Sequence, residues 1–468
     1  MIKNIIAVLA LSLSIKASAG NKIVYYFNHP VDNSVAAGTN AVFLNNCVGD
    51  TLVAYINRSK YTLDIAMYNY TSTQPAIAAA VNNAHARGVK VRWIYDGSQS
   101  NTGLPLLNSG INKLSSPTTS AYTIMHNKFM LVDAQSSDPN DAIVWTGSSN
   151  WNTQQFNYDY NNYVIIQDSA LAHAYHAEFN MMWGGSGLSP DISLAKFGQY
   201  KTDLGRHDFT IDGKHIELYF SPSDGTNSHI QSTIATADKD MYFGMFTFTY
   251  NANATMLVDK RNVGVNVAGI EDVSSNTSTP FGILSSGLGS ANFKTYDGPG
   301  NNIYHNKFVI VDPSDACSDP MVLTGSHNWS FNADTKNDEN TLIIHDATAA
   351  NIYYQSFRSD FAAMGGSLAT VTGCSTSGAS LISLPEQSVH IYPNPANGAF
   401  TLSYELNVPQ AVTIGIYNIT GSRVTDIAAD ERMAQGLHKH NININKAGLY
   451  FIKLTIGGQV IMRKVIIN

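Results

Sequence analysis

Two stretches of the chain share one pattern of hydrophobic and polar positions. Residues 62–71 (TLDIAMYNYT) and 240–249 (DMYFGMFTFT) are apolar runs that end in polar residues, and they lie 178 positions apart. Each run has the length and composition of a buried strand that leads into a turn. Because the pattern recurs at a long fixed offset, the sequence predicts two similar lobes in one chain.

The segments that follow these two strands predict helices. Residues 76–97 begin with an alanine-rich helical run that ends at Arg87-Gly88, and a valine-rich strand then ends at Asp96. Glycine directly after a helical run is a common stop signal. Residues 254–272 repeat this order more weakly. Strands that alternate with helices predict an α/β fold with largely parallel sheets.

Changes in composition predict where the parts of the chain begin and end. The polar stretch 200–214 is expected to separate lobe 1 (20–205) from lobe 2 (206–365), and residues 366–386, rich in Gly, Ser, Thr and Ala, are expected to form a linker. Residues 387–468 show short strand-like runs with turn signals at Asn397-Gly398, Thr420-Gly421 and Gly457-Gly458. This pattern predicts a small all-β sandwich of about seven strands.

The first nineteen residues have the pattern of an export signal. Lys3 gives a positive start, residues 5–13 are apolar, and Ala17-Ser18-Ala19 is a small-residue cleavage site. A short membrane anchor is the alternative, but the apolar run is shorter than the roughly 18 residues that a membrane helix needs. We therefore expect residues 1–19 to be a signal peptide and the protein to be secreted or held at the cell surface.

The charge distribution bears on possible substrates. The composition is globular, with 44% hydrophobic and 13% charged residues, but residues 20–386 hold 19 basic and 31 acidic residues. A protein with this excess of acidic residues is expected to bind a polyanion weakly, which lowers the expectation of a nucleic-acid substrate without excluding it. A local basic cluster (Arg87, Lys90 and Arg92) could line a groove or be a solvated corner. Three cysteines (Cys47, Cys317 and Cys374) leave every disulfide pairing open.

The main chemical signal is a pattern that occurs twice. The first copy is MHNKFMLVD (125–133) followed by TGSSNW (146–151), and the second is YHNKFVIVD (304–312) followed by TGSHNW (324–329). Residues i and i+2 of a strand share a face, so the His and the Lys of each copy are expected to project together. The Gly-Ser turn can bring a hydroxyl, backbone N–H groups and an asparagine beside them.

These residue types favour an anion rather than a metal. A fixed ammonium group repels a divalent cation, whereas two lysines, two serines and two asparagines around one centre suit a phosphoryl group. Two histidines would then provide a nucleophile and a general acid, with no metal or other cofactor. One His-x-Lys pair alone would be an ordinary surface feature, but two copies in the same order argue against that interpretation.

With both copies in view, residues 22–365 resemble the phospholipase D superfamily, whose signature is the HKD motif. The segments IAMYNYTS, ARGVKVRWIYD and MHNKFMLVD are most similar to its compact bacterial endonuclease and cardiolipin-hydrolase branch. That branch usually dimerises to bring two motifs together, whereas this chain has both, so a monomer suffices for a complete site. The resemblance implies two α/β lobes related by a pseudo-two-fold axis and a metal-independent phosphodiesterase that works through a phosphohistidine.

The resemblance also implies a role for each matching residue. The two lysines neutralise phosphate charge, and the two aspartates fix the strand and loop around each histidine. The implied catalytic residues are His126, Lys128, Asp133, His305, Lys307, Asp312 and Glu339. The implied phosphate-binding residues are Ser148, Asn150, Ser326 and Asn328.

One departure from symmetry suggests which histidine does which task. The nuclease branch has a glutamate eleven residues after the asparagine, which orients the histidine through Nδ1; here that position is Glu339 in the second copy but Asn161 in the first. Pairing within each copy would place Glu339 on His305 and Asn161 on His126. A carboxylate favours the protonated ring, so His305 is expected to be the acid and His126 the nucleophile. Asp159 remains an alternative partner for His126.

The last 80 or so residues have their own resemblance. The runs IYPNPANGAFTL, VTIGIYNITGSRV, GLYFIKL and RKVIIN are similar to the C-terminal sorting domain of the type IX secretion system. This implies export by that machinery and removal of the domain. A carbohydrate- or surface-binding β module is the alternative, but Tyr392, Tyr404, Tyr417 and Tyr450 are better explained as strand residues.

Three functions from different classes follow. The leading one is a secreted phospholipase D that converts phospholipid to phosphatidic acid at a membrane surface. Tyr68, Tyr70, Phe246 and Phe248 could contact lipid there or belong to the core. The alternatives are a sequence-independent extracellular nuclease and a surface-binding protein with an inactive site. Two intact motif copies argue against the last.

Overall fold

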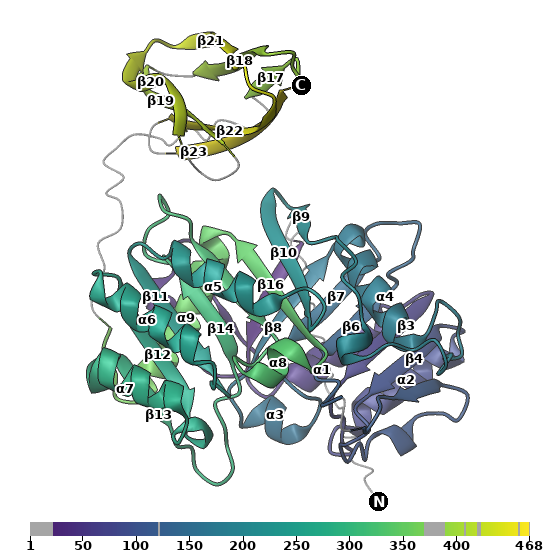
Figure 1. Ribbon diagram of the computed structural model, residues 1–468. Coiled ribbons are helices and arrows are strands. Elements are labelled where there is room, and N and C mark those ends of the chain that lie inside the picture. The colour runs from purple at the N-terminus through teal and green to yellow at the C-terminus, as the bar shows by residue number, and fades with distance from the viewer. Residues whose placement is uncertain are drawn as a thin grey trace, which may run out of the picture. The chain divides into compact units, whose positions relative to one another are not determined.

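The computed structural model describes residues 22–119, 122–368, 389–406, 409–418, 423–456 and 459–467. The expected signal peptide and most of the expected linker lie outside the described residues. The chain divides into two compact units, one up to residue 373 and one from residue 374 onward (Figure 1). Among the described helices, none has the length and apolar character needed to cross a membrane.

The first unit contains two eight-stranded sheets, one in each lobe. Their strand orders are β2-β1-β8-β7-β6-β3-β4-β5 and β13-β12-β11-β14-β15-β16-β10-β9. The first sheet consists of β1 (Ile23–Phe27), β2 (Val42–Phe43), β3 (Thr62–Met67), β4 (Lys90–Tyr95), β5 (Asn112–Ser115), β6 (Lys128–Val132), β7 (Ile143–Gly147) and β8 (Asn162–Gln167). The second consists of β9 (Asp208–Ile211), β10 (Lys214–Ser221), β11 (Asp240–Met245), β12 (Asn266–Asp272), β13 (Phe293–Tyr296), β14 (Lys307–Val311), β15 (Met321–Gly325) and β16 (Glu339–His345).

The expectation of largely parallel sheets is wrong, because both sheets are mixed. Among the described strand pairs, four of seven in the first sheet and five of seven in the second are antiparallel. A parallel pair needs a long crossover such as β3-α2-β4, whereas antiparallel neighbours can be joined by a loop. The motif strands β6 and β7 are joined in the second way, by the polar loop 133–142.

Helices and sheets alternate in five layers. The helices are α1 (Val48–Asn57), α2 (Pro75–Ala86), α3 (Thr153–Asn157), α4 (Ser169–Trp183), α5 (Thr226–Thr236), α6 (Asn251–Asn262), α7 (Thr279–Asn292), α8 (Phe331–Thr335) and α9 (Ala347–Ala363), with short 3-10 turns at Asn33–Val35, Leu104–Leu106, Gly198–Tyr200 and Val273–Ser275. One core joins α4 and α9 to the inner faces of both sheets. Separate cores pack α1 and α2 on the outer face of the first sheet, and α5, α6 and α7 on that of the second (Figure 1). The predicted α/β architecture with two similar lobes is therefore confirmed.

The two motif aspartates end strands β6 and β14 in the same way. Asp133 accepts hydrogen bonds from the backbone N–H groups of Lys60, Tyr61 and Thr62, at 2.8, 2.7 and 2.8 Å. Asp312 accepts from the backbone of residues 238–240 in the second lobe. Each carboxylate thus fixes the chain that enters the neighbouring strand, β3 or β11, far from the histidine-bearing end of its own strand.

Replacing Asp133 by alanine is therefore expected to destabilise the first unit. Three N–H groups would lose a charged acceptor, which corresponds to about 3 kcal/mol in the free energy of unfolding. Urea denaturation followed by circular dichroism measures this loss. Asp297→Ala, at an exposed position, is the control and is expected to change stability by less than about 0.5 kcal/mol. Equal stability of the two variants would contradict the structural role.

The basic cluster considered in the sequence does not form a groove, because Arg92 is buried. Asp64 on β3 lies directly opposite Arg92 on β4. Its carboxylate accepts two hydrogen bonds from the guanidinium, at 2.6 and 2.8 Å. Arg87 and Lys90 are exposed. A charge inside an apolar strand, Asp64, was the sequence signal for this buried pair.

The second unit is the predicted β sandwich. Its described strands are β17 (His390–Tyr392), β18 (Ala399–Leu406), β19 (Gln410–Asn418), β20 (Arg423–Met433), β21 (Gly436–Asn443), β22 (Gly448–Ile456) and β23 (Gln459–Ile467), in sheets of three and four strands with one shared core. The four tyrosines named above all lie in these strands. Gly398 has a φ of +80°, as its predicted turn requires; the turns at 420–421 and 457–458 lie outside the described residues.

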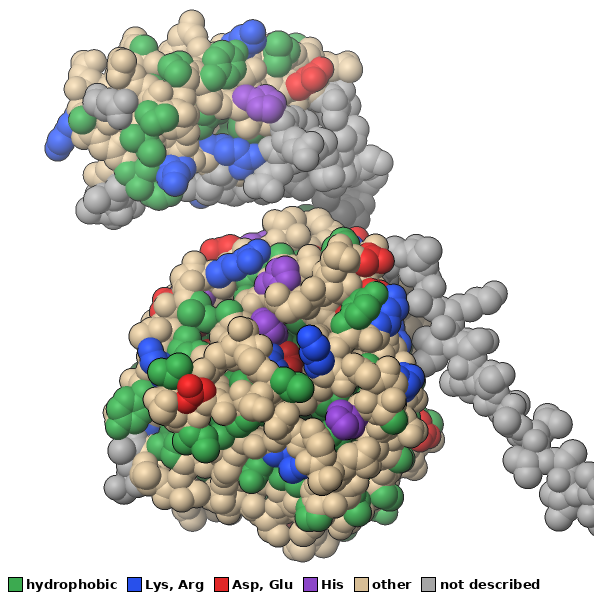
Figure 2. Space-filling view, turned by 90° about the vertical axis from the view of Figure 1, so that its right-hand side faces the viewer, with side chains coloured by type: hydrophobic (Ala, Val, Ile, Leu, Met, Phe, Trp, Pro, Cys, Tyr) green, Lys and Arg blue, Asp and Glu red, His purple; other side chains and the backbone are tan. Residues whose placement is uncertain are grey.

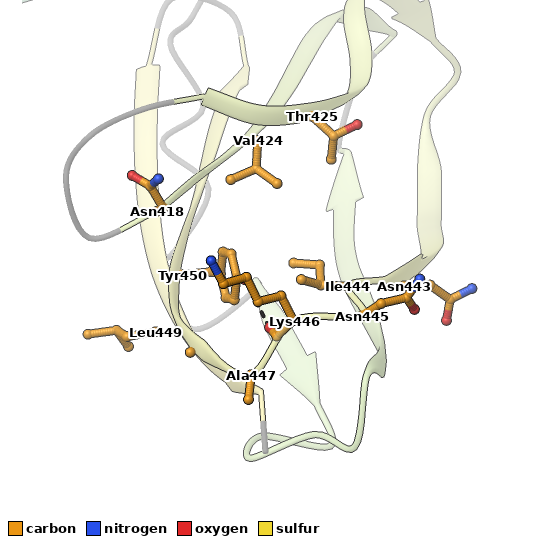
Figure 3. Close-up of a pocket in the computed structure, with 11 residues that line it drawn as sticks. Asn418, Val424, Thr425, Asn443, Ile444, Asn445, Lys446, Ala447, Leu449 and Tyr450 are labelled. Atoms are coloured by element: carbon orange, nitrogen blue, oxygen red, sulfur yellow. Dashed lines mark hydrogen bonds between the residues drawn. The ribbon is translucent and has the colours of Figure 1, made fainter.

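A cavity opens at one end of the sandwich. It has a volume of about 610 Å³, and Figure 3 shows Lys446 and Tyr450 lying across it, with the Tyr450 hydroxyl donating to the Lys446 carbonyl at 2.9 Å.

Of the cysteines, Cys317 is in a disulfide and Cys47 is an exposed free thiol. Every pairing that includes Cys47 is therefore excluded.

Candidate active site

The two lobes meet where the histidine segments begin. Just before β6, the His126 N–H donates to the carbonyl of Asp338 in lobe 2, at 2.9 Å. In the symmetric position, the Tyr160 N–H donates to the carbonyl of Ile303, just before β14, at 3.0 Å. The segment that carries each histidine thus runs alongside the start of β8 or β16 of the other lobe, and the two copies of the motif face one another.

This arrangement overturns the expected pairing of the histidines within each copy. The Nδ1 atom of His126 lies 2.9 and 2.8 Å from the two carboxylate oxygens of Glu339, and Nδ1 of His305 lies 3.0 Å from Oδ1 of Asn161. The partners are exchanged between the lobes because of where they lie on their strands. Glu339 begins β16 and Asn161 directly precedes β8, and the start of each of these strands faces the other lobe. Asp159 does not reach His126; it accepts from Gln154, Gln155 and the N–H of Ile303.

The two motif serines hold these partner residues in place. Ser148 Oγ donates to Asn161 Oδ1 at 2.8 Å, and Ser326 Oγ donates to Glu339 Oε2 at 2.7 Å. Both hydroxyl protons are therefore engaged, and a hydrogen bond from either serine to phosphate requires the hydroxyl to turn. The phosphate-binding role of these serines stays a prediction. The amide oxygens of Asn150 and Asn328 are buried without a hydrogen-bond partner in the described structure.

A second layer of asparagines, which the sequence argument did not identify, ties the two motifs together. Asn162 Nδ2 donates to Asn306 Oδ1 at 2.8 Å, and Asn340 Nδ2 donates to Asn127 Oδ1 at 3.0 Å. All four side chains are buried. The repeat itself could have indicated these residues. Asn127 recurs as Asn306 and Asn162 recurs as Asn340, at the same offsets as the neighbouring motif residues.

In each lobe the motif lysine lies beside one aromatic ring in the same arrangement. Lys128 Nζ donates to the His126 carbonyl at 2.8 Å and lies 5.0 Å from the ring centre of Tyr68. In the other lobe, Lys307 Nζ donates to the His305 carbonyl at 2.7 Å and lies 5.1 Å from the ring centre of Phe246. Tyr70 and Phe248, by contrast, are fully buried in the outer cores. Two of the four aromatics considered are therefore core residues, and two stand against the histidines.

The electrostatics of the site favour an anionic ligand. Burial lowers the pKa of His126 to about 4 and that of Lys128 to about 7. Burial and the neighbouring ammonium groups also hold the pKa values of His305 and Lys307 well below their usual range. Burial opposes ionisation of Glu339, but His126 and Lys128 lower its pKa to about 2. Four basic groups thus surround one carboxylate, and a bound anion would raise all four pKa values.

Comparison with known proteins identifies the families that the two units match. Residues 52–183 and 230–361, more than half of the chain, match the family described as "Cardiolipin synthase, PLD-like domain", and residues 390–468 match a secretion system C-terminal sorting domain. The chain is 32% identical over 137 residues to the mitochondrial cardiolipin hydrolase of Xenopus tropicalis, covering 28% of this chain and 59% of that one. It is 31% identical over 144 residues to the phospholipase D of Rickettsia bellii, covering 31% and 68%.

Similar solved structures include the phosphatidylserine synthase of Haemophilus influenzae. That match has a TM-score of 0.49 and 13% identity, and it covers 67% of this chain and 83% of the other. The phospholipase D family member Nuc of Salmonella typhimurium gives a TM-score of 0.27 with 24% identity over 31% of this chain and 91% of Nuc. The chain spans only about 59% of the length of the first curated relative.

Proposed function

Because the chain belongs to the phospholipase D-like family and ends in a secretion sorting domain, we propose that it is an exported, metal-independent phosphodiesterase that hydrolyses phospholipid to phosphatidic acid. The observation that carries the proposal is the exchange of partners between the lobes. A histidine held by a carboxylate and a histidine held by an amide face the same centre, with one lysine beside each.

In the first half of the reaction, His126 acts as the nucleophile. Its Nδ1–H donates to Glu339, so the lone pair of Nε2 is free to attack phosphorus. A P–N bond forms, the P–O bond to the headgroup breaks, and protonated His305 gives its proton to the departing oxygen. The positive charge that develops on the His126 ring is stabilised by the carboxylate of Glu339. Asn161 is neutral, so His305 can gain and lose its proton without such a fixed charge.

In the second half of the reaction, His305 acts as a general base and water is the nucleophile. His305, now neutral, takes a proton from water, the water oxygen bonds to phosphorus, and the P–N bond breaks to release phosphatidic acid. An alcohol in place of water gives transphosphatidylation by the same steps. Lys128 and Lys307 balance the phosphate charge, which is the task that a divalent ion performs in metal-dependent phosphodiesterases. Binding of the phosphodiester anion restores their protonation.

Two features favour a lipid substrate over nucleic acid. The body of the protein is acidic, and on the face of the first unit in Figure 2 the basic side chains drawn in colour are interspersed with acidic and hydrophobic ones rather than joined in a stripe. Tyr68 and Phe246 also place aromatic surface beside the histidines. The second candidate, an extracellular nuclease, is favoured by the similarity of the motif segments to the compact endonuclease branch.

One assay on the purified full chain separates the two substrates. In EDTA, mixed vesicles of phosphatidylcholine, phosphatidylethanolamine and cardiolipin are incubated beside supercoiled plasmid DNA, and lipid products and plasmid topology are measured. We expect phosphatidic acid to appear and the plasmid to stay intact. Nicked plasmid with unchanged lipid would overturn the lipid proposal in favour of the nuclease. Loss of activity in EDTA by a chain that circular dichroism shows to be folded, with activity restored by added zinc, would overturn metal independence.

A further inference from the structure

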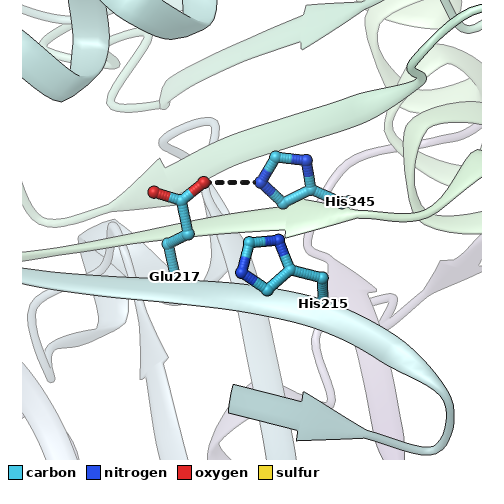
Figure 4. A group of neighbouring side chains, drawn as sticks. All are labelled: His215, Glu217 and His345. Atoms are coloured by element: carbon cyan, nitrogen blue, oxygen red, sulfur yellow. Dashed lines mark hydrogen bonds and ion pairs between the residues drawn. The ribbon is translucent and has the colours of Figure 1, made fainter. Parts of the chain in front are cut away.

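A second group of ionisable side chains lies on lobe 2. His215 and Glu217 are on β10, His345 ends β16, and one ligand atom from each lies within 4.8 Å of the others. His215 and His345 are direct partners across the antiparallel strands, and Glu217 is two residues from His215, so all three side chains leave the same face of the sheet. Figure 4 shows the Glu217 carboxylate and the two imidazole rings gathered above these strands.

We propose that His215, Glu217 and His345 form a zinc-binding site. Two imidazoles and one carboxylate are a donor set that zinc accepts, with a fourth position left for water or another ligand. A hard cation such as Mg²⁺ prefers oxygen ligands alone, so this set discriminates against it. The group is reachable from solvent, since the side chain of His215 is 46% exposed and that of His345 is 30% exposed.

The distances fit a metal that replaces a proton. Nε2 of His345 lies 2.6 Å from Oε1 of Glu217, which is a short contact between the two groups. Zinc bonds of about 2.0–2.1 Å in tetrahedral geometry hold two ligand atoms about 3.3 Å apart. The two side chains therefore need to separate by less than an ångström to admit the ion, and the proton shared between them is released to solvent.

The neighbouring residues complete the site. Oδ1 of Asp208 on β9 lies 2.8 Å from Nε2 of His215, and the Tyr219 hydroxyl donates to the free oxygen of Glu217 at 2.5 Å. Carboxylates and hydroxyls in such positions orient metal ligands in known sites. The adjacent basic residue, Lys214, is occupied by Asp346 at 3.2 Å and does not neutralise Glu217.

Comparison with lobe 1 shows that the fold itself does not need these residues. β1 and β8 pair in the same register as β10 and β16, with Val24 opposite Ile165 where lobe 2 has Glu217 opposite Ile343. The positions equivalent to His215, Glu217 and His345 are therefore Lys22, Val24 and Gln167. The strand pair forms in lobe 1 without any metal-binding side chain, so the cluster is specific to lobe 2.

The location indicates a structural zinc rather than one that takes part in the reaction. Glu339 begins β16 and His345 ends it, so the two lie about 20 Å apart along the strand. A zinc ion there fastens β16 to β10, next to the edge strand β9 of the second sheet. The proposed phosphodiesterase chemistry and this site are independent, and activity in EDTA does not bear on zinc binding.

Isothermal titration calorimetry of the full chain tests the site. After dialysis against EDTA and then metal-free buffer, zinc sulfate is titrated into the protein, with magnesium sulfate as the hard-cation comparison. We expect one zinc ion per chain with a dissociation constant in the micromolar range or below, and no heat from magnesium. Cobalt(II) bound at the same site is expected to give visible absorption bands typical of a four-coordinate ion.

Variants then assign the ligands. His345→Gln introduces the residue that lobe 1 has at this position, Glu217→Gln keeps the shape of the side chain, and both are expected to weaken zinc binding by about 100-fold or more. His207→Gln is the matched control, because His207 belongs to a separate group with Asp203 and Asp224. Zinc binding that is lost in His207→Gln but kept in His345→Gln would overturn the proposal, as would the absence of zinc binding in a folded wild-type chain.

Discussion

Replacing His126 by alanine is expected to abolish phosphodiesterase activity, with a fall in kcat of about 10³-fold or more. The same change at His305 is expected to act differently on the two half-reactions. A lipid with a p-nitrophenol headgroup has a leaving group that departs without an acid, so His305→Ala still allows attack by His126. Without a base to activate water, the phosphoenzyme then accumulates. Mass spectrometry of a rapid acid-free digest locates the phosphoryl group, which we expect on His126.

The control for this experiment is His173→Ala, because His173 is exposed on α4. We expect it to retain wild-type activity. A phosphoryl group on His305 in the His126→Ala variant, together with none on His126 in the His305→Ala variant, would reverse the assigned roles. Full activity of both single variants would show that the paired histidines are not the reacting groups.

The local elements of each lobe could be predicted from the sequence because their signals are local. The strand at 62–67 and the helix that ends before Gly88 follow from a short apolar run and from a glycine with a φ of +93°. The His-Lys pairs also follow from strand geometry. The repeat at a fixed offset then predicts two lobes with one motif each, and this is what the structure has.

What could not be predicted is which lobe supplies each partner. Sequence spacing places Glu339 in the same copy as His305, but a hydrogen bond depends on which side chains face each other across the lobes. The bridge between Met125 and Asp338 brings the neighbouring Glu339 to His126 instead. The burial of Arg92 was not predicted for a related reason, since its partner Asp64 is 28 residues away in the sequence and is adjacent only in the sheet.

The exchange of partners leaves the proposed roles unchanged but replaces the reason for them. Sequence spacing pairs the carboxylate with His305, the expected acid, whereas in the structure it lies against His126. A carboxylate on Nδ1 raises the basicity of the ring and stabilises the positive charge that phosphorylation places on it, as the aspartate does for the histidine of a serine protease. A nucleophile that carries a phosphoryl group through an intermediate gains more from that fixed charge than an acid that must release its proton.

Replacing Glu339 by glutamine is expected to lower kcat by about 10³-fold while KM changes little. The amide oxygen of glutamine can still accept the hydrogen bond from Nδ1 of His126 and from Ser326, so the ring stays oriented. The charge is lost, together with the hydrogen bond that Asn337 Nδ2 donates to the other carboxylate oxygen at 3.2 Å. Initial rates over a range of vesicle concentrations separate kcat from KM, and thermal unfolding confirms that the variant is folded. A rate within tenfold of wild type would show that the charge of Glu339 is unimportant.

The near symmetry of the lobes allows a sharper form of this test, in which the carboxylate is moved rather than removed. Asn161→Glu combined with Glu339→Asn gives the charge to His305 and the amide to His126, and Ser148 remains in place to hold the new carboxylate as Ser326 holds Glu339. If the carboxylate decides which histidine is the nucleophile, the double variant is at least tenfold more active than Glu339→Asn alone, and the trapped phosphoryl group moves to His305. A folded double variant that keeps the phosphoryl group on His126 would show instead that the direction of substrate binding sets the roles, because the two rings otherwise have matching lysine contacts and one aromatic ring beside each.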